Sequence, residues 1–175
     1  MSTLKVNSLL DASGNPLSRV LQVVSSIKKD TASNSTGAGS TWEFNDSSLR
    51  AQITASSSSS IFLIMGSITT SGLSIHTALR DSGSNSALFA DNANARREST
   101  SGHDHSDSHS ASTVPIIGTI TAGDTNEHTF YYQFSHTSGS TQTLYINRGT
   151  NDGDAYDRGR YVSSIVVMEI AAWAN

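Results

Sequence analysis

The feature that most constrains the fold is a series of short strand-like segments separated by turns rich in Ser, Asn and Gly. The pattern is clearest between Glu127 and His136, where Phe130, Tyr132 and Phe134 alternate with more polar positions. Alternation with a period of two is typical of a strand with one buried face. About ten such segments at even spacing predict an all-β fold, an antiparallel sandwich or barrel.

Composition supports short strands with many turns, because 35% of the residues are hydrophobic and only 15% are charged. The expected strands are Val20–Lys28, Thr41–Asn45, Leu49–Thr54, Ile61–Thr69, Leu73–Arg80, Ala87–Ala90, Val114–Thr121, Glu127–His136, Thr141–Arg148 and Val162–Trp173. Ala32–Ser40 and Asp91–Thr113 are expected to be loops. A net charge of −4 implies no basic face, so nucleic acid is not an expected partner. The absence of cysteine excludes disulfides and fits assembly in a reducing cytoplasm.

The N-terminal segment differs in character from the rest of the chain. Its large apolar residues are few, and the dense turn signal Asp11–Pro16 follows them. A segment of this kind buries too little surface to fold alone, so residues 1–17 are expected to be a docking arm and residues 18–175 a single head domain. The arm lacks the features of a signal peptide. The longest apolar stretch, Ile61–Met65, is far shorter than a membrane span, so no membrane insertion is expected.

Two of the expected strands, Ile61–Met65 and Ile165–Met168, are apolar at every position. A sandwich strand normally turns only one face to the core, so such a strand needs a second cover. That cover is either a loop of the same chain or another subunit. We favour the second reading and predict a homo-oligomer, because exposed apolar patches usually mark interfaces. The residues predicted at the interface are Ile61, Leu63, Met65, Ile165, Val167 and Trp173.

Several motifs, taken in order, give the chain a family resemblance. Residues 3–15 resemble the opening of tail-fibre-like proteins from phages of marine and freshwater bacteria, cyanophages among them. The body is similar to a domain common in such phages. Its marks are Ile53–Ala55 before a serine run and the strand Ile61–Ile68, then Ala90–Arg97, Thr143–Arg148 and Ser163–Ile170. The resemblance covers nearly the whole chain.

The resemblance implies a structural protein of a bacteriophage virion and not an enzyme. It implies a jelly-roll-like, trimeric head, with Leu4, Val6, Leu9 and Leu10 of the arm attaching it to other virion proteins. The protein would be assembled in the host cytoplasm and released by lysis. A short fibre-like or tip component that contacts a host surface glycan or protein is the leading hypothesis. A capsid decoration (cement) protein is the second, and a small polysaccharide hydrolase is a remote third.

The insert Gly102–His109 departs from the family pattern. His103 and His105 are two residues apart, which in a strand places them on one face. Similar His-x-His arrangements in phage fibre and spike tips hold a transition metal on a threefold axis, and imidazole suits such metals. The metal hypothesis therefore names His103, His105 and His109 as ligands. A solvated polar loop is the simpler interpretation and the one we favour.

Loops on a rigid sandwich are the usual place for recognition. The candidate receptor-contact residues lie in the loops Asp91–Thr113 and Gly149–Arg160, and they are Arg96, Arg97, Asp154 and Tyr156. The acidic segment Asn151–Asp157 lacks the spacing of an EF-hand, so we interpret it as a turn and not as a calcium site. The sequence contains neither a Gly-x-Ser-x-Gly elbow nor a phosphate-binding loop, and no catalytic residues are predicted.

Overall fold

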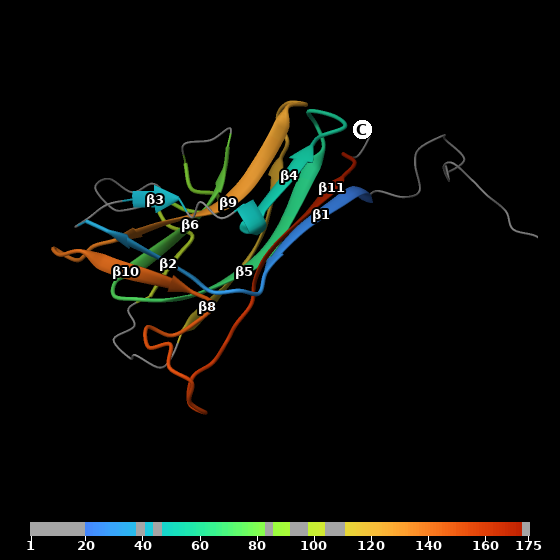
Figure 1. Cartoon of the computed structure of the whole chain (residues 1–175). Helices are drawn as coiled ribbons and strands as arrows, with labels where there is room; N and C mark the ends of the chain where they lie inside the picture. The colour runs from blue at the N-terminus through green and yellow to red at the C-terminus, as the bar shows by residue number, and fades with distance from the viewer. Residues whose placement is uncertain are drawn as a thin grey trace, which may run out of the picture.

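The computed structural model describes residues 20–37, 41–43, 47–82, 86–91, 98–103 and 111–172. Within those ranges the side chains of residues 36, 41–43, 47 and 103 are not described. The predicted docking arm and Trp173 lie outside the described residues. The chain forms two antiparallel sheets that pack face to face, which confirms the predicted all-β sandwich (Figure 1).

One sheet has six strands in the order β1-β11-β5-β10-β2, with β8 also paired to β5. Its strands are β1 (Val20–Lys28), β2 (Ala32–Thr36), β5 (Ile61–Ser71), β8 (Ser112–Thr121), β10 (Gln142–Ile146) and β11 (Ser163–Ile170). The other sheet has the order β3-β9-β6-β7, with β4 also paired to β9. Its strands are β3 (Thr41–Glu43), β4 (Arg50–Thr54), β6 (Ile75–Asp81), β7 (Ser101–His103) and β9 (Glu127–His136), and the 3-10 helix η1 (Ser47–Leu49) precedes β4.

The core lies between the two sheets and is built from the inward positions of alternating strands. Phe130, Tyr132 and Phe134 of β9 are at most 1% exposed, as their alternation predicts. The Phe62 ring of β5 meets the Phe130 ring edge-on, with 5.8 Å between ring centroids. The Tyr132 hydroxyl donates a hydrogen bond to the carbonyl of Ser164 in β11, 3.1 Å away, and so ties the sheets together directly. Burial raises the pKa of Tyr132, so this hydroxyl stays protonated.

Three local predictions were wrong. The segment Ala32–Thr36, expected to be loop, forms edge strand β2, because backbone pairing with β10 compensates for its small polar side chains. β7 is likewise a short strand within the expected polar loop, paired to β6. Ala87–Ala90 is not a strand. Only Leu88 forms an isolated bridge, to Leu79, and the next residue, Phe89, has a φ of 59° that ends any extended run.

Candidate contact loop and outward face

The loop between β10 and β11 is anchored at its base by one buried side chain, Asn147, which is 0% exposed. Its amide nitrogen donates hydrogen bonds to the carbonyls of Lys28 (2.9 Å) and Asp30 (3.0 Å). Its amide oxygen accepts a bond of 2.6 Å from the Ser163 hydroxyl. Asn147 has a φ of 59°, a left-handed conformation that asparagine tolerates better than most residues. The base of the loop is therefore fixed to the end of β1 and the start of β11.

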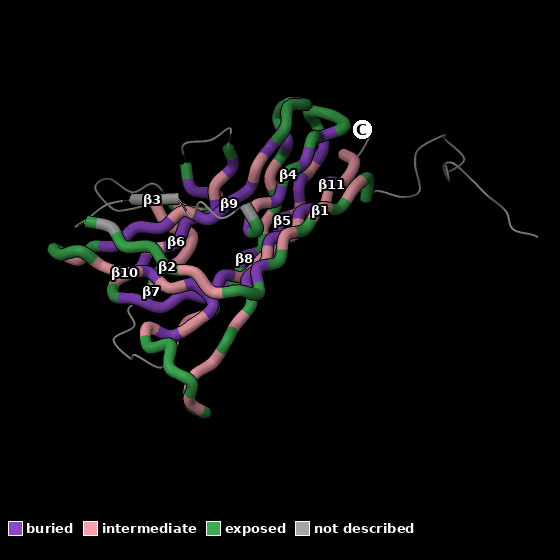
Figure 2. Tube along the Cα trace, viewed as in Figure 1, coloured by how far each residue is buried: buried purple, intermediate pink, exposed green. Residues whose placement is uncertain are grey.

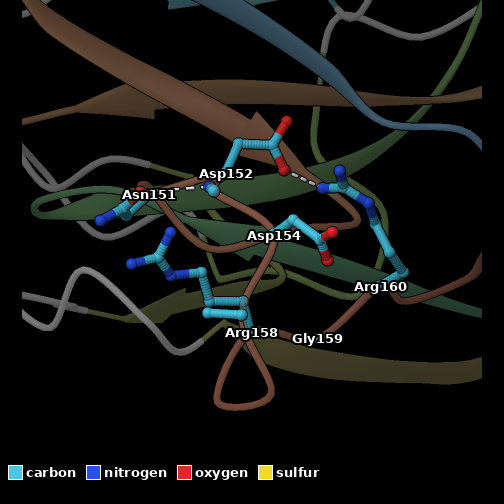
Figure 3. Close-up of a pocket in the computed structure, with 8 residues that line it drawn as sticks. Asn151, Asp152, Asp154, Arg158, Gly159 and Arg160 are labelled. Carbon is cyan, nitrogen blue, oxygen red and sulfur yellow. Dashed lines mark hydrogen bonds and ion pairs between the residues drawn. The ribbon is translucent and has the colours of Figure 1, made fainter.

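Ion pairs close the loop above this base. Arg148 and Arg160 face each other in an isolated antiparallel bridge, and the Asp152 carboxylate lies between their side chains. The Asp152 carboxylate accepts a hydrogen bond from Arg160 (Figure 3). It also lies 3.5 Å from the Arg148 guanidinium. The hydrogen bond from Arg160, with the added positive charge of Arg148, holds the pKa of Asp152 below its ordinary value. Surface loops whose ends are held close and whose own side chains pack them are often functional.

The closed loop presents polar groups around a hollow of about 220 Å³. Figure 3 shows Asn151, Asp154 and Arg158 around it. Asp154 lines the hollow and is exposed, and Tyr156, two residues further along the same loop, is fully exposed. These two predicted contact residues therefore lie in one structured loop. The other two, Arg96 and Arg97, lie outside the described residues.

The structure leaves the metal hypothesis untested. His103 lies in β7 with its side chain not described, while His105 and His109 fall outside the described ranges. Among the side chains that the structure does describe, no group of three or more His, Cys, Asp or Glu residues is placed to hold a metal ion.

One histidine is paired in the core. The Nδ1 atom of His128 lies 2.7 Å from the Asp81 carboxylate, and its Nε2 atom lies 3.4 Å from that of Asp124. The ring also packs against Phe62 and Phe130, with centroid distances of 5.2 and 6.3 Å. Because both ring nitrogens face carboxylates, His128 connects β6, β9 and the turn before β9, and we assign it a structural role.

A second polar anchor lies at the end of the sandwich away from the loop. Glu169 of β11 is 0% exposed, and its carboxylate accepts a bond of 2.6 Å from the Gln22 amide. It also accepts bonds from the Ser56 backbone (2.7 Å) and hydroxyl (3.1 Å). Gln22 donates to the carbonyl of Thr54 as well. These contacts attach the start of β1 to the turn between β4 and β5.

The two all-apolar strands use both of their faces, and the structure divides the predicted interface residues between them. Ile61, Leu63 and Met65 of β5 point away from the core and are partly exposed. Ile165 and Val167 do not lie on that face. Both point inward and are fully buried between the sheets, so they cannot meet another subunit unless the sandwich opens. The prediction that Ile165 and Val167 face another subunit is wrong, because both side chains lie on the inward face of β11.

The residues of β11 on the same outward face as Ile61, Leu63 and Met65 are the neighbours of Ile165 and Val167. Val166 is opposite Met65, Met168 is opposite Leu63, and Ile170 is opposite Ile61. The outward apolar face continues on both sides, onto β1 and β8. Buried and partly exposed residues alternate along β11 and along β5 from Ile61 to Met65 (Figure 2). We define this outward apolar face as Val20, Val23, Ile27, Ile61, Leu63, Met65, Ile117, Val166, Met168 and Ile170. The sequence analysis did not predict the members on β1 and β8. These four, Val20, Val23, Ile27 and Ile117, are 46–72% exposed.

Comparison with known proteins gives no independent identification. No protein-family model matches the sequence, and no curated protein is significantly similar to it. The described residues include no helix of the length and hydrophobicity that a membrane crossing needs.

Replacing Asn147 by Gly is expected to destabilise the fold and loosen the loop. Glycine keeps the left-handed backbone conformation but leaves two carbonyls and the Ser163 hydroxyl without this partner. Each buried polar group left unsatisfied costs about 1–3 kcal/mol, so we expect a loss of at least about 2 kcal/mol in denaturant unfolding. Hydrogen exchange of residues 149–161 should also accelerate. The exposed Asn126→Gly variant is the control, and equal behaviour of the two variants would contradict the anchoring role.

Replacing Glu169 by Gln should reduce stability mainly above pH 5. Burial by itself raises the pKa of Glu169, but hydrogen bonds from Gln22 and Ser56 outweigh it, so the net pKa lies below the ordinary 4.5. A lowered folded-state pKa gives stability that is present above about pH 4.5 and is lost as the pH falls through the folded value. Thermal melts between pH 3 and 7 should therefore show a steep acid loss in the wild type and a flatter profile in Glu169→Gln. The exposed Glu127→Gln variant should retain the wild-type profile.

Proposed function

We propose that this chain is a structural component of a bacteriophage virion, a short fibre-like or tip protein that displays its β-sandwich for contact with the host surface. The observation that carries the proposal is that the predicted arm and the closed loop belong to opposite ends of the sandwich. The predicted docking arm enters the fold at Val20, at one end of β1, and the closed loop is anchored at Lys28, the other end of the same strand. Figure 1 shows the start of β1 and this loop at opposite ends of the sandwich.

The length of β1 sets the separation between the two ends of the sandwich. Nine residues of extended strand span about 30 Å, so a virion-bound arm would hold the loop roughly that far from the attachment point. The two polar anchors stand at the two ends of this span. Glu169 secures β1 near the arm, and Asn147 secures it near the loop. A rigid body between an attachment segment and a structured loop is what a displayed contact site requires.

The sequence resemblance to tail-fibre-like phage proteins supports the same proposal and adds a homotrimeric, jelly-roll-like head, which stays a prediction. Capsid decoration remains the second candidate, because an arm that binds neighbouring capsid subunits would also leave the loop at the opposite end of the sandwich. A small polysaccharide hydrolase is a distant third. Release of reducing sugar from host polysaccharide would favour the hydrolase, and capsid fragility in particles lacking the protein would favour decoration.

The two ends of the sandwich make separable predictions. The Asp154→Asn/Tyr156→Ala double variant should bind host cells at least about tenfold more weakly than the wild-type head, since it removes a charge and an aromatic face from the loop without touching its anchors. The control is Glu127→Gln with Asn126→Ala, two exposed positions at the start of β9, away from the loop. Flow cytometry with a labelled head measures the binding.

Deleting Ser2–Pro16 should abolish incorporation into particles while leaving the head folded, as read by circular dichroism and by immunoblots of purified virions. Wild-type incorporation of the truncated chain would overturn the attachment role. Host binding that is unaffected by the loop variant would overturn the contact role of the loop and leave decoration as the better hypothesis.

A further inference from the structure

We infer that the outward apolar face is covered by a second copy of this chain. The inference rests on the proposed function and names a surface through which two copies of the head associate. Pairing of one face with itself is twofold, so this contact is separate from the predicted trimer contact. The face spans four neighbouring strands, β8, β5, β11 and β1, whose pairing is continuous. Cross-strand rows run through it, such as Ile117, Met65 and Val166.

The few charged residues of these four strands face inward, whereas charged residues usually face water. β1, β5, β8 and β11 contain only two charged residues, Lys28 and Glu169. Both are at most 1% exposed, and both belong to the inward register of their strands. The outward positions of these four described strands therefore carry no charge at all. A sheet face that meets water normally alternates apolar-in with polar-out, and charged residues at the core of a surface patch are typically depleted only in interfaces.

In the edge strand β1, polar residues face inward and large apolar residues face outward. Gln22, Ser26 and Lys28 face inward, while Val23 and Ile27 face outward and are 52% and 55% exposed. The inward polar groups are used, since Ser26 donates to the carbonyl of Ser48 and Gln22 bonds Glu169. Among the described residues, no comparable contact accounts for the outward valine and isoleucine. Natural edge strands tend to carry charges that block association, and β1 lacks them on this face.

The size of the face fits a contact between copies. Four strands spaced about 4.8 Å apart and seven residues of about 3.3 Å each give a projected area of about 440 Å². This area includes a few serine and threonine positions, and it lies in the range of a few hundred Å² at which a mainly apolar patch is often functional. Two such faces together contribute about 900 Å² in projection, and the corrugated side chains add to this. The total then approaches the 1,000 Å² or more that a specific interface buries.

The composition of the face favours a copy of itself as the occupant. The chain carries a net charge of −4, so two copies meet without like-charge repulsion only where both surfaces are neutral, as they are here. The centre is formed by Leu63, Met65 and Met168, and Ser25 and Thr119 lie toward the sides. A centre of large apolar side chains without a charged neighbour on the face has the composition of an interface core. Flexible methionines at the centre let two identical surfaces interdigitate.

The test is the native mass of the full chain by light scattering, from about 1 to 100 µM. The inference predicts a multiple of the 18.5 kDa chain. Ile117→Lys and Val23→Lys, at opposite sides of the face, should each weaken association by at least about tenfold, since each would bury an unpaired charge. The control is Leu73→Lys, which changes a comparably exposed leucine in the turn between β5 and β6 and should leave the mass unchanged.

Three results would overturn the inference. A wild-type chain that is monomeric throughout this range would mean that a different partner covers the face. An oligomer that tolerates both lysine variants would place the contact elsewhere. A truncated chain without Ser2–Pro16 that becomes monomeric would assign association to the arm. Circular dichroism of each variant checks folding, and Ile117→Ser provides a milder change that should weaken association less than lysine does. Host binding and particle incorporation are measured separately, so the proposed function can fail while this inference holds, and the reverse.

Discussion

The antiparallel pairing of β5 with β11 is the constraint on which the rest of the structure depends. The register runs without a shift from Ser164 opposite Ser67 to Ile170 opposite Ile61. It places Phe62, Ile64 and Val167 in the core at 0% exposure. The same register turns the intervening isoleucine, leucine, methionine and valine residues outward. Because side chains alternate with a period of two, one pairing determines both the core and the outward face, and a slip of one residue would exchange them.

Two buried polar residues fix how the rest of the chain attaches to this pair of strands. Glu169 binds the start of β1 and the turn before β5, and Asn147 binds the end of β1 and the start of β11. Both are 0% exposed and fully used in hydrogen bonds, which is the condition under which burial of polar groups specifies structure instead of weakening it. They explain why a polar segment as long as the β10–β11 loop keeps a defined shape at the end of the sandwich.

Sequence periodicity predicted much of the fold and less of the site. The bounds of β1 and β9 were predicted correctly, because their flanks change sharply in composition. β2 could not be predicted from its residues, since its pairing comes from the backbone and its side chains are small and polar. The apolar runs in β5 and β11 indicated a second cover, but a run that is apolar at every position does not show which residues face out. That information lies in the register, which placed Ile165 inward and Val166 outward. The anchoring role of Asn147 had no sequence signal, because its partners are distant backbone carbonyls.

The sandwich has three surfaces of different character: an end where β1 begins, an end that presents a closed polar loop, and a broad uncharged face between them. The uncharged face is the central feature, because apolar patches of this kind usually mark interfaces and we infer that a second copy of the chain covers this one. Hydroxyl-radical footprinting read by mass spectrometry measures that cover directly at Met65 and Met168. The account predicts slow oxidation of both methionines in the wild-type protein at high concentration, and faster oxidation on dilution or in Ile117→Lys. Rapid oxidation of both at every concentration would contradict it.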